Sequence, residues 1–231
     1  EIHGNRVLGL HLVPGLHVDA EERDDGISAQ LRVDEGAVIA NPVRLCFGLL
    51  SDRGVQKIDM DVQLGAGSRI AVLSSCTFPN AVDVLHTMDA EIEIGRQAEY
   101  IYLERHVHGP EGGVTVVPKA RVTLDEGARF QTDFELIKGR VGRIDIDYDA
   151  VCGAHSILDM SARISGSADD RITINEKAAL NGEGAHGVLR TNIAVGGTAR
   201  ADIKNTLIAA APFARGHVDC KEIVRDNAVA K

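Results

Sequence analysis

Apolar and polar residues alternate along most of this 231-residue chain. Each alternating segment is followed by a turn that places glycine beside a small residue, and then by another alternating segment. Successive side chains of a strand point to opposite faces, so the pattern predicts strands with one buried face. Helical periodicity is almost absent. The clearest copies lie at 31–39, 61–70, 90–98 and 122–130, and later copies turn at 152–154, 182–185 and 196–199.

The copies recur at a period of about 25 to 30 residues, which is typical of solenoids and propellers. Glycine supplies the positive φ of compact turns at little cost, and strands that stack on the next coil need such turns. We therefore predict an all-β fold, a parallel β-helix with few or no helices. A β-sandwich with similar turns is the alternative.

The N-terminal part, residues 1–40, is predicted to form strands and a loop that lead into a repetitive core at 41–231. Alternation over 6–13 predicts a first strand, and the acidic run at 19–26 predicts a solvated loop. Three histidines in this part are interpreted as surface residues rather than metal ligands: His3, His11 and His17.

The net charge of the chain narrows the classes of partner that it can bind. It carries 34 acidic and 25 basic residues, a net charge of -9, and an acidic protein attracts neither nucleic acid nor an anionic membrane. No apolar run approaches the roughly 20 residues that span a bilayer. Four cysteines lie far apart without a CxxC motif, which fits a reducing compartment, so we expect a cytoplasmic protein. No Gly-Lys-Ser/Thr loop is present, and we expect no nucleotide on this chain.

The segment 214–223 carries the first candidate chemistry. If it is a strand, His217 and Asp219 share one face, while Cys220 shares the other with Val218. The thiol could be a packed core residue, a nucleophilic thiolate or a ligand for a soft metal. The spacing does not choose among these three roles.

Two further groups could bind a metal. Cys152 precedes His155 by three residues, and stacked coils that bring 152–155 next to 217–220 would create a mixed Cys/His site for iron, copper or zinc. His106 and His108 lie on one face of a strand, which suits a metal pair but also any polar strand face. The other two cysteines are interpreted as core residues: Cys46 and Cys76.

Alternating acids suggest a different function. Asp145, Asp147 and Asp149 lie on one strand face, and paired carboxylates serve acid/base chemistry in carbohydrate-active enzymes. The same pattern fits a solvated outer face. Aromatic residues make up only 3% of the chain, with no Trp to stack on sugar rings, so the outer face is the favoured interpretation.

Three runs resemble a known family: Arg143-Ile-Asp-Ile-Asp-Tyr-Asp-Ala-Val-Cys-Gly153, His186-Gly-Val-Leu-Arg-Thr191 and above all Ala211-Pro-Phe-Ala-Arg-Gly-His-Val-Asp-Cys-Lys-Glu-Ile223. They resemble the core of the SufB/SufD family, the scaffold proteins of the SUF machinery for iron-sulfur cluster assembly. The resemblance covers roughly residues 40 to 231 and is strongest after residue 120. It implies a right-handed parallel β-helix, in agreement with the repeats.

The resemblance also implies a function. The family's scaffolds are not enzymes; they work with a SufC-type ABC ATPase and dimerise with a SufB/SufD paralogue or with themselves. They receive persulfide sulfur through a cysteine desulfurase pathway and hold a transient iron-sulfur cluster.

Cys220 matches the position of a SufB cysteine that holds sulfur or cluster, and Cys152 falls near a second family cysteine. His217 and Asp219 are neighbours of the matched cysteine, which makes Cys220 and His217 the candidate metal ligands. We expect a neighbouring imidazole or Lys221 to lower the pKa of the Cys220 thiol.

The chain also departs from the family. Members usually continue with a further coil and a helical segment that grips the ATPase, and this chain reaches Lys231 before either. Because it also begins at Glu1 rather than Met, we interpret it as part of something longer. Whether its role is SufB-like, or SufD-like and purely structural, stays open.

Overall fold

The computed structural model describes residues 1–231, and every regular element in it is a strand. Eighteen strands form two nine-stranded sheets. They are β1 (Ile2–His3), β2 (Arg6–Val7), β3 (Leu16–Glu22), β4 (Ile27–Val33), β5 (Val43–Gly48), β6 (Arg53–Leu64), β7 (Arg69–Phe78), β8 (Asp83–Ile94), β9 (Glu99–His108), β10 (Val114–Leu124), β11 (Arg129–Lys138), β12 (Arg143–Cys152), β13 (Ile157–Gly166), β14 (Arg171–Leu180), β15 (His186–Val195), β16 (Arg200–Ala209), β17 (Arg215–Val224) and β18 (Val229–Ala230).

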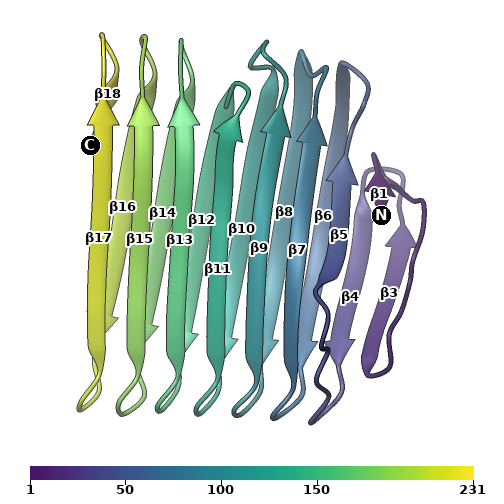
Figure 1. Cartoon of the computed structure of the whole chain (residues 1–231), viewed down its shortest axis with the longest axis vertical. Coiled ribbons are helices and arrows are strands. Elements are labelled where there is room, and N and C mark those ends of the chain that lie inside the picture. Colours follow the sequence, from purple (N-terminus) through teal and green to yellow (C-terminus); the bar gives the residue numbers. More distant parts are fainter.

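The chain winds as a parallel β-helix of about 7 turns. From β5 onward, odd-numbered strands form one sheet and even-numbered strands the other, and the coils stack so that the termini lie at opposite ends (Figure 1). Val116 lies beside Ile144, 28 residues on, and Ile27 beside Ile58, 31 residues on. The parallel β-helix predicted from the alternation is therefore confirmed, and the sandwich alternative is wrong.

The core fills the space between the two sheets. Every second side chain points inward, and each inward side chain stacks on the equivalent one of the next coil. Val116, Ile144 and Ile172 form one such row, with exposed fractions of 0%, 0% and 2%. Small aliphatic side chains suit this arrangement because the spacing between coils is fixed by backbone hydrogen bonds.

The turns that join the sheets also stack. Gly36 N–H donates to Ala66 O, and Gly67 N–H donates to Arg96 O, both at 2.8 Å. Gly36 and Gly67 have positive φ, as predicted for glycine turns, but Gln97 and His155 take the same conformation at the equivalent place in later coils. The stacked hydrogen bonds hold these residues in a conformation that non-glycine residues rarely adopt.

The N-terminal part differs from the prediction in two places. The predicted strand at 6–13 is wrong beyond Val7, because only Arg6–Val7 pairs, with β1. The predicted loop at 19–26 is also wrong in its first part, because β3 runs through Glu22 and pairs antiparallel with β4. Its acidic residues lie exposed on an edge strand, a common means of discouraging further strand pairing.

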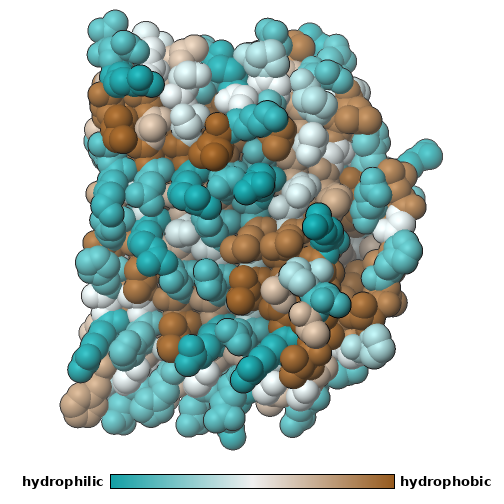
Figure 2. Space-filling view, viewed as in Figure 1, coloured by the Kyte–Doolittle hydropathy of each residue, from teal (hydrophilic) through white to brown (hydrophobic).

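The outer surface combines hydrophilic and hydrophobic areas. In Figure 2 hydrophilic side chains cover most of the visible face, and smaller hydrophobic patches interrupt them. No helix in the structure has the length and apolar character needed to cross a membrane.

Candidate functional site

Cys220 lies on β17, the outermost strand of its sheet. It pairs in register with Thr191 of β15, whose side chain is fully buried. Cys220 therefore belongs to the inward row of its coil, and it is exposed because β17 is the outermost strand. Cys76 and Cys152 are buried, and the interpretation of Cys76 as a core residue is confirmed. The same interpretation of Cys46 is wrong, because Cys46 is exposed.

The Cys220 thiol has acidic surroundings. Its Sγ lies 3.6 Å from Glu222 Oε1, which can accept a weak hydrogen bond from it. Partial burial and then the negative charge of Glu222 raise the pKa of Cys220 to about 11, with smaller contributions from Asp219 and Glu176. The expectation that a neighbouring imidazole or Lys221 lowers this pKa is wrong, because Lys221 Nζ pairs with Asp219 at 2.7 Å instead.

His217 and Asp219 lie on the outer face of β17. Their register partners on β15 are Val188 and Arg190, which alternate with the fully buried Leu189 and Thr191. The predicted sharing of faces along this strand is confirmed. The hydrogen bond from Lys221 lowers the pKa of Asp219 despite some desolvation. Because Cys220 points to the opposite face, the structure does not bring the candidate pair Cys220 and His217 together.

Cys152 lies elsewhere. It is the last residue of β12, in the other sheet and three strands away from β18, and it is fully buried. His155 lies exposed in the following turn with a φ of 56°. Burial raises the pKa of the Cys152 thiol to about 11. The expectation that stacked coils join 152–155 to 217–220 is therefore wrong.

Polar side chains line the interior near Cys220. Glu176 on β14 is 2% exposed, and its Oε2 has no hydrogen-bond partner. Burial raises the pKa of Glu176 to about 7. Its register partner on β16 is Asn205, whose Nδ2 donates to Thr191 Oγ1 at 2.8 Å. A thiol near Glu222 and Glu176 forms a site that can attract a cation, and a bound cation would favour release of the thiol proton.

A second cluster lies deeper in the solenoid, and of its members the sequence pattern singled out only His106 as a candidate metal ligand. Cys76 of β7 and His106 of β9 are register partners, and His86 reaches them from the opposite sheet. One potential ligand atom from each lies within 4.8 Å of the other two. The expectation that His106 and His108 share a face is confirmed, and both are buried inside the coils.

The ionisation of this cluster follows from its burial. Burial raises the pKa of the Cys76 thiol well above its usual value, and the nearby Glu104 adds to the effect. Desolvation lowers the pKa of His86 to about 3 and that of His108 to about 4. Burial opposes ionisation of Glu104, but the hydrogen bond to His106, at 2.6 Å, lowers the pKa of Glu104 overall.

The three alternating aspartates lie on the outer face of β12 and are already partnered. Asp145 pairs with Arg143 at 2.7 Å, and Asp149 with Lys177 at 3.1 Å. Asp147 Oδ1 accepts a hydrogen bond from Asn175 Nδ2 at 2.7 Å. Their arrangement matches the interpretation as a solvated outer face.

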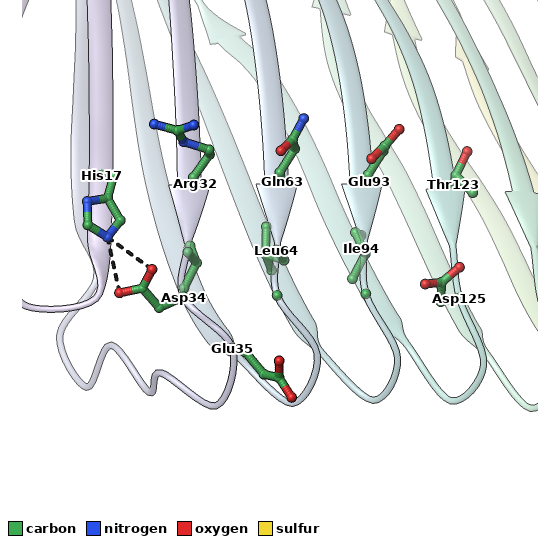
Figure 3. A pocket seen from close by; sticks show the side chains of 13 residues that line it. His17, Arg32, Asp34, Glu35, Gln63, Leu64, Glu93, Ile94, Thr123 and Asp125 are labelled. Atoms are coloured by element: carbon green, nitrogen blue, oxygen red, sulfur yellow. Dashed lines mark hydrogen bonds and ion pairs between the residues drawn. The ribbon is translucent and has the colours of Figure 1, made fainter.

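An open groove of about 820 Å³ lies at the turn end of the even-numbered sheet. Figure 3 shows Arg32, Gln63, Glu93 and Thr123 side by side on successive strands, and the ion pair between His17 and Asp34 at 3.0 Å. This groove contains no cysteine, so it does not overlap either thiol site.

Comparison with known proteins gives two curated relatives. The chain is 32% identical over 224 residues to an iron-sulfur cluster assembly SufBD family protein of Methanocaldococcus jannaschii, covering 97% of this chain and 71% of that protein. It is 30% identical over 227 residues to a protein of the same description from Pyrococcus horikoshii, covering 98% and 69%. No family model matches the chain. At this identity and coverage, the chain belongs to the iron-sulfur cluster assembly SufBD family.

Proposed function

We propose that this chain is a cytoplasmic, non-enzymatic scaffold for iron-sulfur cluster assembly, and that Cys220 accepts sulfur or iron during assembly. Family membership supports participation in cluster assembly. The observation that carries the finer role is the position of Cys220: it is an inward-row thiol that is exposed and close to the Glu222 carboxylate.

The chemistry of the Cys220 site suits a cationic cargo. With the site empty, the adjacent carboxylates favour the neutral thiol, because a second negative charge beside Glu222 is unfavourable. Ferrous iron reverses this preference, since it is attracted by the carboxylates and binds the thiolate. The thiol is thus protonated before loading and becomes a ligand when iron arrives.

Anaerobic reconstitution tests this role. The purified, reduced chain is incubated with ferrous iron and sulfide, and visible absorption and bound iron are measured for wild type, Cys220→Ser and the exposed-thiol control Cys46→Ser. We expect sulfur-to-iron charge-transfer absorption in wild type and in Cys46→Ser, and its loss in Cys220→Ser. Equal absorption in all three proteins would contradict the role of Cys220.

The same role implies partners. We propose a SufC-type ABC ATPase, a second SufBD chain and a cysteine desulfurase pathway as the source of persulfide. An outermost parallel strand such as β17 carries unpaired backbone groups along one side, which a second chain can cover. Light scattering should then give a mass above the 24.7 kDa of the monomer at micromolar concentration.

A SufD-like role without a cluster is the second candidate. It is favoured by the raised pKa of Cys220, which leaves the thiol protonated at neutral pH unless a cation binds. Absence of cluster absorption in both wild type and Cys220→Ser after reconstitution, together with a stable complex with a second SufBD chain, would support this structural role.

A further inference from the structure

We infer that the interior of the solenoid contains a binding site for a divalent first-row transition-metal ion such as Zn²⁺ or Fe²⁺, formed by Cys76, His86 and His106. The site is independent of Cys220. It is the only group of three or more potential metal ligands in the chain whose donor atoms converge.

The fold holds the three side chains in place from two sides. Cys76 and His106 are register partners on the neighbouring strands β7 and β9, so their spacing is set by backbone hydrogen bonds. His86 comes from β8 in the opposite sheet, beside Gln56 and Val116. The three residues are 0%, 1% and 1% exposed. Ligands that come from rigid strands and cannot turn away to solvent favour a defined metal geometry.

His86 has an unused ligand atom. Its Nδ1 is buried and has no hydrogen-bond partner, although buried polar atoms are nearly always paired. A metal ion bound through this nitrogen would satisfy an atom that is otherwise costly to bury.

The hydrogen bonds around His106 determine which of its atoms is free for a metal. Arg140 O can only accept, so His108 Nδ1, at 3.0 Å, carries a proton. His108 Nε2 then accepts from His106 Nδ1 at 3.3 Å. The remaining atom, His106 Nε2, lies 2.6 Å from Glu104 Oε1 and shares a proton with it. A metal that replaces this proton finds an imidazole already oriented by its other nitrogen, as in other protein metal sites.

The charges balance when a divalent ion binds. Before binding, His106 Nε2 and Glu104 Oε1 share one proton across their 2.6 Å contact, and Cys76 is a neutral thiol. Binding of the ion releases this shared proton and the thiol proton of Cys76, and leaves a thiolate and a carboxylate beside a charge of +2. Glu104 Oε1 also lies 3.6 Å from Cys76 Sγ, so it is placed to serve as the fourth ligand. The net charge stays zero, which a dry interior requires.

The distances between the donor atoms are close to those of a tetrahedral metal site. Zinc binds sulfur at about 2.3 Å and nitrogen at about 2.0–2.1 Å, which places the ligands of a tetrahedral site about 3.3–3.8 Å apart. The donor atoms of Cys76, His86 and His106 lie within 4.8 Å of one another, so small side-chain rotations bring them together. Glu104 Oε1 must instead move away from His106 Nε2, which is now 2.6 Å from it. Thiolate and imidazole together favour zinc or ferrous iron over magnesium or calcium.

Cobalt substitution tests the site directly. The chain is stripped of metal, reduced and titrated anaerobically with Co²⁺. We expect one equivalent to give tetrahedral visible bands and thiolate-to-cobalt charge transfer, and Zn²⁺ to displace it. Cys76→Ser should remove the charge transfer, and His86→Gln should weaken binding at least about tenfold. Cys152→Ser removes an equally buried thiol and should bind Co²⁺ like wild type.

The outcomes separate this site from the Cys220 site. Cys220→Ser should keep the cobalt spectrum even though it loses the reconstituted cluster, and the two proposals can therefore fail independently. Absence of charge transfer in wild type, or its persistence in Cys76→Ser, would overturn the interior site. If the Cys76 variant does not fold, the wild type decides: Zn²⁺ but not Mg²⁺ should raise its melting temperature, and equal melting with both ions would overturn the site.

Discussion

Burial decides the ionisation of single residues in this molecule more than sequence neighbours do. Lys221 adjoins Cys220 in sequence but points to the other face and pairs with Asp219, while burial and Glu222 raise the pKa of the Cys220 thiol. Glu176 is a simpler case, because burial is the only cause of its raised pKa.

Glu176 should make the stability of the protein depend on pH. Its pKa is about 7 in the folded state against an ordinary value of 4.5. Between these values the unfolded chain loses the proton and the folded chain keeps it, so stability falls as pH rises from 4.5 to 7 and then levels off. The loss is about 3 kcal/mol at most.

Urea unfolding at a series of pH values measures this effect. The Glu176→Gln variant has no ionisable group at that position, so its stability relative to wild type should rise across the same pH range. A difference between the two proteins that does not change with pH would show that Glu176 is already ionised in the fold.

At the scale of the element, the sequence predicted where the strands lie, but it predicted only some of the contacts between side chains of different strands. Alternation predicted the strands and correctly put His106 and His108 on one face. Cys76 precedes His106 by 30 residues, about one coil, and that spacing was the available signal for the interior cluster. The repeat period could not identify His86 as part of the cluster, because His86 lies in the opposite sheet. Which residues of two sheets face each other depends on turn lengths, and the period does not determine these.

The positions of the turns were predicted from their glycines, and one of these glycines allows a test of backbone strain in a turn. Gly36 has a φ of 69° and open space around an added Cβ. Gly36→Ala should therefore lower the free energy of unfolding by about 1 kcal/mol through backbone strain alone. Gly9→Ala is the control, because Gly9 has neither a positive φ nor a close neighbour. Equal urea midpoints for the two variants would contradict strain at the turn.

At the scale of the whole molecule, stability is distributed along a stack in which each coil contacts mainly its neighbours. The period of the repeats predicted the stack of coils. It did not predict that β3 pairs antiparallel with β4, because the acidic residues at 19–22 are typical of a loop. Side chains in central coils are covered on both sides, whereas those of β17 are exposed.

This difference predicts unequal effects of shortening inward side chains. Ile144 in β12 is fully buried, so Ile144→Ala should destabilise the protein by about 2–5 kcal/mol. Val224 in β17 is 45% exposed, and Val224→Ala should cost less than about 1 kcal/mol. Chemical denaturation of both variants under conditions where light scattering gives the monomer mass checks the comparison, and similar losses there would contradict the exposure of β17.

The constant rise of the coils also fixes how far apart the two thiol sites are. Cys76 on β7 and Cys220 on β17 are five strands apart in the same sheet. At about 4.8 Å between neighbouring strands, their separation is about 24 Å. A disulfide needs Cα atoms within about 7 Å, so oxidation cannot join these cysteines within one chain and one cluster cannot bridge them. The solenoid acts as a rigid spacer that keeps the two thiols out of each other's reach.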